Sequence, residues 1–567
     1  MEESPAKNES ASTGASGRSE STSASAWSPL RQTLFRSIWI ALIVSNIGTW
    51  MHSVGVAWLM TELTASPLLV ALMQTAVSLP IFFFGLPAGA LADIVDRRKL
   101  LIATESWMLL VALALGILTL TGYVSAWVLL ALTFLLGLGT ALDAPAWQAI
   151  IPELVKREDL PAAVALNATG FNIARAIGPA IGGLIVAAAG PQAVFFLNAI
   201  SFLFVSVVIF RWRRDQIPSN APPEEMLGAT AAGMRYMRHA PALQAVLVRT
   251  GVFILGASAL WALLPVIVRQ ELGLDATGYG IVLGSIGLGG VMGALLMPRL
   301  RRSLSVDLLA AMATAVFAGT TLALAYLRLL PLLLLGMIAG GMAWLAIMSS
   351  LTVVAQTAVP AWVRARALGI YLLVFQGLMA AGSFGWGALA EQFGSGTALF
   401  MAALVLVGGL AAIWRWPLRV IEGLDLSPSQ HWPDPKLAIT PAPKDGPVLI
   451  TVEYRVPAEQ TKEFIQAMEA IRHFRHKDGA IRWGIFRDLA DPDRYLETFL
   501  VSTWAEHMRQ HTRVTKEDQA TEAYAFSFLD PDVPPIACHL IDARIFGGRT
   551  RADFARTDIP VRTQLQL

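Results

Sequence analysis

The stretch Gly89–Lys99, GALADIVDRRK, marks the point where one long apolar run ends and the next begins. More than twenty largely apolar residues precede Asp93. Five charged residues then fall within seven positions: Asp93, Asp96, Arg97, Arg98 and Lys99. Because about twenty apolar residues cross the hydrocarbon core of a bilayer, this change of character indicates the water-exposed end of a membrane helix.

The same stretch has a counterpart in the second half of the chain. GALLMPRLRRS begins at residue 293 and again places two arginines eight and nine residues after the glycine. A second pair, QAIIPELVKRED at 148 and QTAVPAWVRARA at 356, lies at a similar offset. Shared membrane composition is the alternative explanation, but two polar loop matches at nearly equal offsets argue against it. The repeat predicts two six-helix bundles with a pathway between them.

The charge distribution separates a membrane part from water-soluble flanks. Of the 567 residues, 15% are charged, against about 25% in soluble proteins. Residues 35–416 hold only 36 of the 84 charged side chains. The net charge of +2 argues against a nucleic-acid partner, and the single cysteine, Cys538, excludes an intrachain disulfide. The N-terminus lacks the apolar core of a signal peptide.

Twelve apolar segments are long enough to span a bilayer. They begin near Phe35, Pro67, Leu100, Ser125, Pro161, Pro191, Leu243, Ala276, Val306, Leu330, Val363 and Thr397. Alternate loops carry fifteen Lys and Arg, whereas the opposite loops carry two, Arg269 and Arg328. The basic side is expected to be cytoplasmic. We therefore expect an all-α, multi-pass cell-membrane protein with both termini in the cytoplasm.

The domain boundaries follow from these segments and from the soluble flanks. The expected parts are a disordered cytoplasmic tail (1–34), an N-terminal bundle (35–212), a cytoplasmic linker (213–242), a C-terminal bundle (243–416), a Pro-rich linker (417–447), a small cytoplasmic α+β domain (448–545) and a tail (546–567).

The sequence of the soluble domain predicts strands and amphipathic helices in the order β-α-β-β-α-β. The second of the two helices is expected to be continuous over AEHMRQHTRVTKEDQATEAYAF. This order is that of a ferredoxin-like fold. It resembles the small antibiotic-biosynthesis-monooxygenase type of domain, which implies a homodimer formed through the sheet. His507 and His511 have the spacing of a metal pair, but Cys538-His539 is a weak third candidate. We expect no metal here, and a role in dimerisation or regulation.

Gly89-x-x-x-Asp93-x-x-x-Arg97-Arg98 resembles the loop signature of the major facilitator superfamily, although Ile94 and Asp96 depart from it. Three further segments resemble the siderophore-exporter (enterobactin-exporter-like) branch: NIGTWMHSVGVAWLM, ALDAPAWQAIIPELVKREDL and ALNATGFNIARAIGPAIGGLIV. The resemblance covers about residues 30–420. It implies a transporter that alternates between inward-open and outward-open states.

The resemblance also assigns roles to the loop signature. Gly89 and Asp93 would belong to a cluster that holds the inner gate shut, with Arg97 and Arg98 as the local basic partners of Asp93. Carboxylates and arginines make charge-assisted bonds that break when two bundles separate. Simple anchoring of the helix end is the alternative.

Ionisable residues inside spans are costly and mark functional sites by default. Glu105, Asp143 and Arg175 are the main candidates, and Asp143 is expected to pair with Arg175 or to couple export to protons. Arg249 is expected to reach the cytoplasmic surface by snorkelling.

Gly178, Pro179, Gly182 and Gly183 resemble the glycine-proline signature of antiporters. The resemblance places this segment at the contact between the two halves and associates it with export. Close packing of glycine-rich helices in general is the alternative.

Polar or amphipathic groups inside spans are candidates for a substrate cavity: Asn46, Trp50, His52 and Gln376. Bonding between neighbouring helices is the alternative for each.

These observations predict a transporter rather than an enzyme. The leading hypothesis is a secondary-active exporter of a small amphipathic molecule such as a siderophore, driven by proton antiport and needing no cofactor. No ATP-binding loop of the G-x-x-x-x-G-K-S/T type is present in the sequence. A multidrug or hydrophobic-compound efflux pump is the alternative. A membrane-tethered enzyme or sensor is the alternative from another class.

Overall fold

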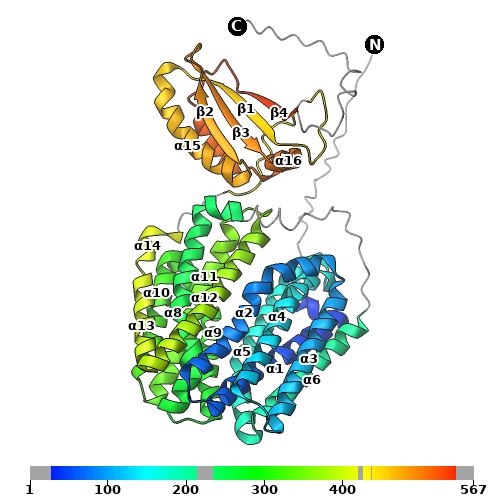
Figure 1. Ribbon diagram of the computed structural model, residues 1–567, viewed down its shortest axis with the longest axis vertical. Coiled ribbons are helices and arrows are strands. Elements are labelled where there is room, and N and C mark those ends of the chain that lie inside the picture. Colours follow the sequence, from blue (N-terminus) through cyan, green and yellow to red (C-terminus); the bar gives the residue numbers. More distant parts are fainter. Residues whose placement is uncertain (1–26, 213–233, 419–424, 436, 544–567) are drawn as a thin grey trace, which may run out of the picture.

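The computed structural model describes residues 27–212, 234–418, 425–435 and 437–543, without the side chain of Asp93 (Figure 1). Most of the expected tails and residues 213–233 of the expected linker therefore lie outside the described residues. Within the expected N-terminal tail, Ser28–Arg31 form a short 3₁₀ helix, and the Ser28 hydroxyl donates to Asp159 at 2.5 Å. The first long helix already begins at Thr33.

Within the described residues, twelve long helices are apolar enough to cross a membrane, as the sequence predicts. The first half contains α1 (Thr33–Leu63), α2 (Pro67–Ile94), α3 (Arg97–Leu120), α4 (Ala126–Leu154), α5 (Leu160–Ala189) and α6 (Pro191–Arg211). The second half contains α8 (Pro241–Val266, continued by a π-turn over Ile267–Glu271), α9 (Ala276–Ser303), α10 (Val306–Tyr326), α11 (Leu330–Thr357), α12 (Arg364–Phe393), α13 (Ser395–Gly409) and α14 (Ala412–Arg415).

Local chemistry explains several of these boundaries. Ser66, Ser125 and Ser305 accept hydrogen bonds from backbone N–H groups at the starts of α2, α4 and α10, which otherwise lack partners. Gly190 and Gly394 join α5 to α6 and α12 to α13 with φ of 81° and 86°, a conformation that glycine adopts without strain. These glycines occupy equivalent turns in the two halves, so the repeat seen in the sequence extends to the turns.

The two halves lie side by side and meet along two pairs of helices (Figure 1). α2 packs along α12, and α5 packs along α9. We call the end of the helical part that faces the C-terminal domain the proximal end, and the opposite end the distal end. At the distal end, the Ser66 hydroxyl donates to Glu391 at 2.7 Å, and Arg269 donates to Thr61 at 3.2 Å. These bonds join the halves and close the distal end.

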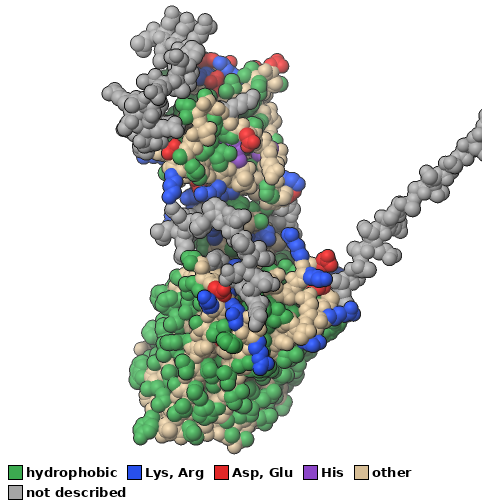
Figure 2. All heavy atoms as spheres, turned by 90° about the vertical axis from the view of Figure 1, so that its right-hand side faces the viewer, with side chains coloured by type: hydrophobic (Ala, Val, Ile, Leu, Met, Phe, Trp, Pro, Cys, Tyr) green, Lys and Arg blue, Asp and Glu red, His purple; other side chains and the backbone are tan. Residues whose placement is uncertain are grey.

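The surface separates into an apolar and a charged region. Hydrophobic side chains cover the distal part of the face shown in Figure 2, whereas Lys and Arg gather toward the proximal end. This distribution is what a bilayer around the helices requires, because charged groups are costly in hydrocarbon.

The C-terminal domain is a four-stranded antiparallel sheet with helices. Its elements are β1 (Val448–Arg455), α15 (Thr461–Asp478), β2 (Arg482–Arg487), β3 (Arg494–Val501), α16 (Trp504–Arg513), α17 (Lys516–Phe526) and β4 (Ile536–Ile541). The strand order is β2-β3-β1-β4, which is the ferredoxin-like arrangement that the sequence predicts. Alternate residues of β1 and β3 face a core built around Tyr454, Phe464 and Tyr495.

The prediction of a single second helix in this domain is wrong. The chain forms α16 and α17 with a break at Val514 and Thr515. Thr515 starts α17 through a capping box, in which its hydroxyl and the Asp518 carboxylate each bond the other residue's backbone N–H. This reciprocal bonding satisfies two N–H groups that a continuous helix would use otherwise.

The C-terminal domain contacts the proximal end through α16. Arg235, in a short helix over residues 234–239, donates to Glu506 at 2.9 Å. The Arg513 guanidinium lies 4.2 Å from the ring centre of Trp362, in the turn between α11 and α12. The soluble domain is therefore held against both the linker and the second half.

Candidate functional site

A cavity of about 590 Å³ lies between the two halves. Seven residues singled out in the sequence line it: Asn46, Trp50, His52, Glu105, Asp143, Arg175 and Gln376. Aromatic side chains from the second half complete the wall, among them Trp261, Trp344 and Phe375. This size and mixed apolar–polar lining are typical of sites for drug-sized molecules. The functional roles of the seven residues stay predictions.

Two acids from neighbouring helices lie together in the wall. Asp143 of α4 accepts a hydrogen bond from the Thr104 hydroxyl of α3 at 2.7 Å. Glu105, the next residue on α3, is 2% exposed and lines the cavity together with Asp143. The Trp147 indole, one helical turn beyond Asp143, lines the same cavity. The sequence reasoning missed Trp147, although its i+4 spacing from Asp143 was visible.

The expected pairing of Asp143 with Arg175 is wrong. In the described part of the chain no ion pair joins them, and Asp143 bonds Thr104 instead. The Arg175 guanidinium lies between two indoles, 5.9 Å from the ring centre of Trp50 and 5.7 Å from that of Trp261. Trp50 belongs to the first half and Trp261 to the second. Cation–π contacts with one indole of each half therefore hold the positive charge of Arg175 at the interface between the halves.

The remaining polar candidates make few contacts with other helices. Asn46 donates to the Leu42 carbonyl of its own helix at 2.8 Å. Neither ring nitrogen of His52 has a hydrogen-bond partner, and its ring packs against Phe195 at 4.8 Å between ring centres. Trp261 and Trp344 make an edge-to-face contact at 5.3 Å. The cavity wall is therefore mainly apolar, with aromatic side chains from both halves and polar groups between them.

The loop signature is tied into the first half through its basic residues. Arg97 donates to Glu153 of α4 at 2.7 Å, and Arg98 donates to the Ile209 carbonyl near the end of α6 at 3.2 Å. Asp96 caps α3 by accepting from the backbone N–H of Arg98 at 2.9 Å. The side chain of Asp93 lies outside the described residues, and Gly89 has open space where a side chain would stand. The gate role stays a prediction.

The glycine-proline segment faces two neighbours. A methyl group on Gly178 would lie 2.6 Å from the Trp50 Cβ, and one on Gly182 would lie 2.8 Å from the Met51 Cα, both on α1. One on Gly183 would lie 2.5 Å from the Ala276 carbonyl oxygen of α9. Pro179 also faces α9, where its carbonyl lies against Gly280. Only Gly183 and Pro179 thus contact the other half.

Gly183→Ala is expected to weaken closure of the distal end, because the added methyl group forces α5 away from the α9 backbone. Such overpacking costs about 1–3 kcal/mol, which is roughly a 5- to 100-fold shift between two states. The reporter is a single cysteine in the cavity wall, introduced as Gln74→Cys in a Cys538→Ala background. The measurement is the rate at which an impermeant maleimide, added from the distal side, labels this cysteine. Gly319→Ala is the control, because its methyl group meets nothing within 4 Å. Equal labelling in both variants would contradict the expectation.

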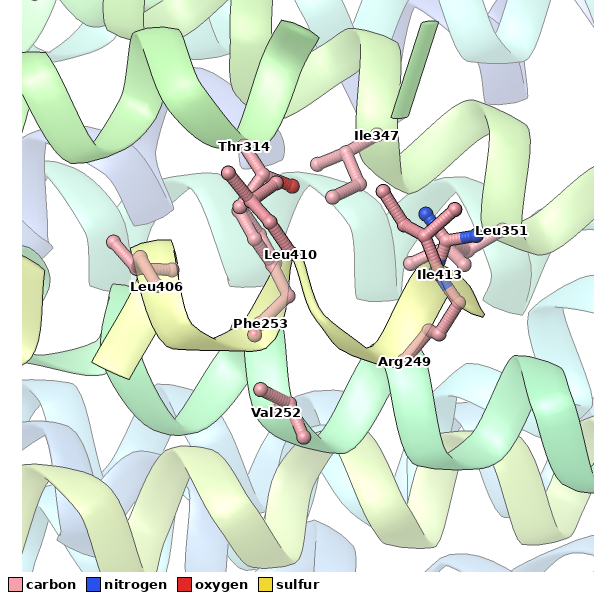
Figure 3. A pocket seen from close by; sticks show the side chains of 10 residues that line it. Arg249, Val252, Phe253, Thr314, Ile347, Leu351, Leu406, Leu410 and Ile413 are labelled. Carbon is pink, nitrogen blue, oxygen red and sulfur yellow. The ribbon is translucent and has the colours of Figure 1, made fainter. Parts of the chain in front are cut away.

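Arg249 does not reach the surface, which corrects the snorkelling prediction. It is 8% exposed and forms an ion pair with Asp307 of α10, and Asp307 also accepts from the Leu418 backbone N–H at 3.0 Å. In Figure 3, the Arg249 side chain rises from α8 beside Leu351 and Ile413. The space around it is only about 20 Å³. The pair therefore fastens the proximal ends of α8 and α10 rather than forming a second binding cavity.

The C-terminal domain has a charged core of its own. Arg475 of α15 donates to Glu497 of β3 at 3.0 Å and pairs with Glu522 of α17 at 3.0 Å, and all three are at most 3% exposed. Burial opposes ionisation of Glu522, but Arg475 and bonds from His431 and Trp432 hold its pKa below the usual value. This network joins α15, the sheet and α17.

Twelve membrane helices in two repeated halves, with a lined cavity between them, define a membrane transporter fold. The family signature described as transmembrane secretion effector matches residues 24–545, so the chain belongs to that family of the major facilitator superfamily. The fold and family are those of transporters, not of enzymes.

Three curated relatives share 26–28% identity with the chain. The multidrug efflux pump Tap of Mycolicibacterium fortuitum is 27% identical over 68% of this chain and 96% of its own length. The enterobactin exporter EntS of Shigella boydii is 26% identical over 59% of this chain and 80% of its own. The uncharacterised transporter YfiS of Bacillus subtilis is 28% identical over 35% of this chain, a match that spans about half of that relative.

A solved structure shows the same fold. A bacterial homologue of the human lysosomal transporter Spinster, in an inward-facing, occupied conformation, superposes with a TM-score of 0.56 at 13% identity. The match covers 69% of this chain and 98% of that protein.

Proposed function

We propose that this protein is a proton-driven exporter of small amphipathic molecules that carry acidic groups, with a siderophore as the leading substrate class. The observation that carries the proposal is the cavity between the halves, in which a cation, an acid pair and an aromatic wall converge. Relatives named as an enterobactin exporter and a multidrug efflux pump support export as the direction.

The acid pair supplies the coupling. Glu105 and Asp143 lie side by side in apolar surroundings and line the cavity. Two adjacent carboxyl groups titrate together, and the exchange of one proton changes the charge that the membrane part must accommodate. That change links proton movement to the state of the two halves. Asp93, Arg97, Arg98 and Gly89 would form the gate at the proximal end.

The orientation belongs to the same proposal. Arg and Lys gather at the proximal end, so this end and the C-terminal domain would be cytoplasmic. The expected homodimer finds support in the sheet, where Leu449, Leu500 and Leu540 are register partners on three strands. Leu540 is 52% exposed, so this corner of the sheet offers apolar surface to a second copy.

Arg175 is the observation that favours an acidic substrate over a lipophilic cation. In the described part of the chain no carboxylate pairs with it, and its contacts are with two indole rings. An unpaired guanidinium in a low-dielectric cavity attracts carboxylates and catecholates and repels cations. A multidrug pump for lipophilic cations is the second candidate, supported by the aromatic wall.

The test is efflux from energised cells loaded with enterobactin, staphyloferrin A, erythromycin or ethidium. We expect uncoupler-sensitive export of a siderophore, lowered about tenfold or more by Arg175→Gln, because loss of a charge-assisted bond to substrate costs about 1.5–3 kcal/mol. Arg328→Gln is the matched control, since Arg328 lies at the distal end and pairs with Glu271 within the second half, away from the cavity. Export of ethidium alone, unchanged by Arg175→Gln, would replace the proposal with the multidrug candidate.

A further inference from the structure

Three histidines of the C-terminal domain come together although the sequence separates them. His507 and His511 lie one turn apart on α16, and β4 brings His539 against them. One ligating atom from each residue lies within 4.8 Å of the others. The ring centres of His507 and His539 are 4.8 Å apart, and those of His507 and His511 are 5.0 Å apart. The sequence left His539 a weak candidate because strand pairing, not spacing, places it here.

Among the described residues, two ring nitrogens of the cluster have no hydrogen-bond partner. His507 is 1% exposed, and its Nδ1 lies 3.1 Å from the Gln510 side-chain oxygen. Because that oxygen only accepts, Nδ1 must be the donor, and Nε2 keeps an unshared lone pair. Nε2 of His507 and Nδ1 of His511 are both buried without a partner. Buried nitrogens without a hydrogen-bond partner are rare in folded proteins, and a bound ion would satisfy these two.

The surroundings resemble the outer shell of a metal centre. Gln510 holds the ring of His507 through its Nδ1, and the Trp432 ring packs edge-to-face on His511 at 5.3 Å between ring centres. Trp504 packs against His507 at 5.3 Å and against His539 at 6.0 Å. A neutral imidazole with a free ring nitrogen is the form that binds metal.

We propose that His507, His511 and His539 bind a divalent transition-metal ion, with Zn²⁺ as the expected ion. Three imidazoles with an open fourth position suit tetrahedral zinc, whose bonds of about 2.0–2.1 Å place ligand nitrogens roughly 3.3 Å apart. The nitrogens, now within 4.8 Å, need to move by about 1.5 Å at most. This assignment is independent of the proposed transport function, and it replaces the expectation of no metal.

The site has a structural consequence for the docked domain. β4 is an edge strand that pairs only with β1, and the metal would fasten it to α16. Glu506 and Arg513 of the same helix hold Arg235 and Trp362 at the proximal end of the helical part. Metal binding would therefore stabilise the helix through which the soluble domain contacts the transporter.

The test is zinc binding by the full-length protein in detergent, purified with a tag that contains no histidine and stripped with EDTA. After reloading with Zn²⁺ and gel filtration, elemental analysis is expected to find one zinc per chain. Co²⁺ is expected to give the visible absorption of a four-coordinate imidazole site. His539→Ala and His511→Ala are each expected to weaken zinc binding at least about tenfold.

Two comparisons keep the result decisive if one ligand variant misfolds. His473→Ala is the matched control, because His473 is exposed on α15, outside the cluster, and is expected to bind zinc like the wild type. Zinc is also expected to raise the unfolding temperature of the wild type, by an amount that grows with the logarithm of the zinc concentration above the dissociation constant. Substoichiometric zinc in the wild type, or equal zinc in the wild type and both ligand variants, would overturn the proposal.

Discussion

Asp143→Asn is expected to abolish uncoupler-sensitive export while the protein still inserts and folds. Asparagine keeps the side-chain oxygen that accepts from Thr104 at 2.7 Å, so the packing of α3 on α4 should survive. It cannot ionise, so the charge change that Asp143 shares with Glu105 is lost. Loss of an obligatory proton step lowers concentrative transport by orders of magnitude rather than by a small factor. The measurement is initial efflux of the siderophore identified in cells, with and without uncoupler.

The chain provides a matched control for this substitution. Asp275 starts α9 at the distal end and accepts from the Gly278 backbone N–H at 2.9 Å. Asparagine caps a helix about as well as aspartate, so Asp275→Asn should export normally. Glu105→Gln should share the defect of Asp143→Asn, because the two acids lie together in the cavity wall. Normal uncoupler-sensitive export by Asp143→Asn would exclude Asp143 from coupling.

Arg475→Met is expected to unfold the C-terminal domain or to destabilise it by about 3–5 kcal/mol. The substitution leaves Glu497 and Glu522 facing each other in the core without their shared cation. Removing one partner of a buried ion pair has this cost because the remaining charge is uncompensated. Methionine keeps most of the side-chain volume, so the effect reports charge rather than a cavity.

The comparison for this prediction is Arg472→Met on the same helix. Arg472 pairs with Glu469, and both side chains are about half exposed. Exposed pairs contribute about 0–1 kcal/mol, so this variant should retain the wild-type melting curve. Limited proteolysis and thermal unfolding of the full-length protein measure both. Similar stability of the two variants would show that the buried network does not hold the domain together.

The sequence was sufficient for the twelve spans because a bilayer imposes length and composition on each helix separately. This constraint predicts that helices begin near Pro67, Pro191 and Leu330, and the structure confirms these three starts. The order of strands and helices along the C-terminal domain also followed from local alternation, apart from the break between α16 and α17. Both are properties that neighbouring residues along the chain determine.

Partners across helices were not predictable in the same way. Depth along adjacent spans suggested Asp143 with Arg175, but helix rotation decides which faces meet, and it turns Asp143 toward Thr104 and Arg175 toward two indoles. The partner of Arg249, Asp307, was not considered because the pair joins α8 and α10, which are not adjacent along the chain. His539 reached the histidine pair only through the register of β4 on β1. These contacts depend on tertiary packing.

Transport by the purified protein in proteoliposomes tests the central claim most directly. The vesicles carry an imposed pH gradient with an acidic lumen, and labelled enterobactin is supplied outside. A proton antiporter is expected to accumulate the compound in the lumen above its external concentration, and accumulation should collapse when the gradient is dissipated. Asp143→Asn should still exchange labelled for unlabelled compound but should not accumulate it. Accumulation by the wild type that does not depend on the gradient, or equal accumulation by Asp143→Asn, would contradict proton-driven export through this cavity.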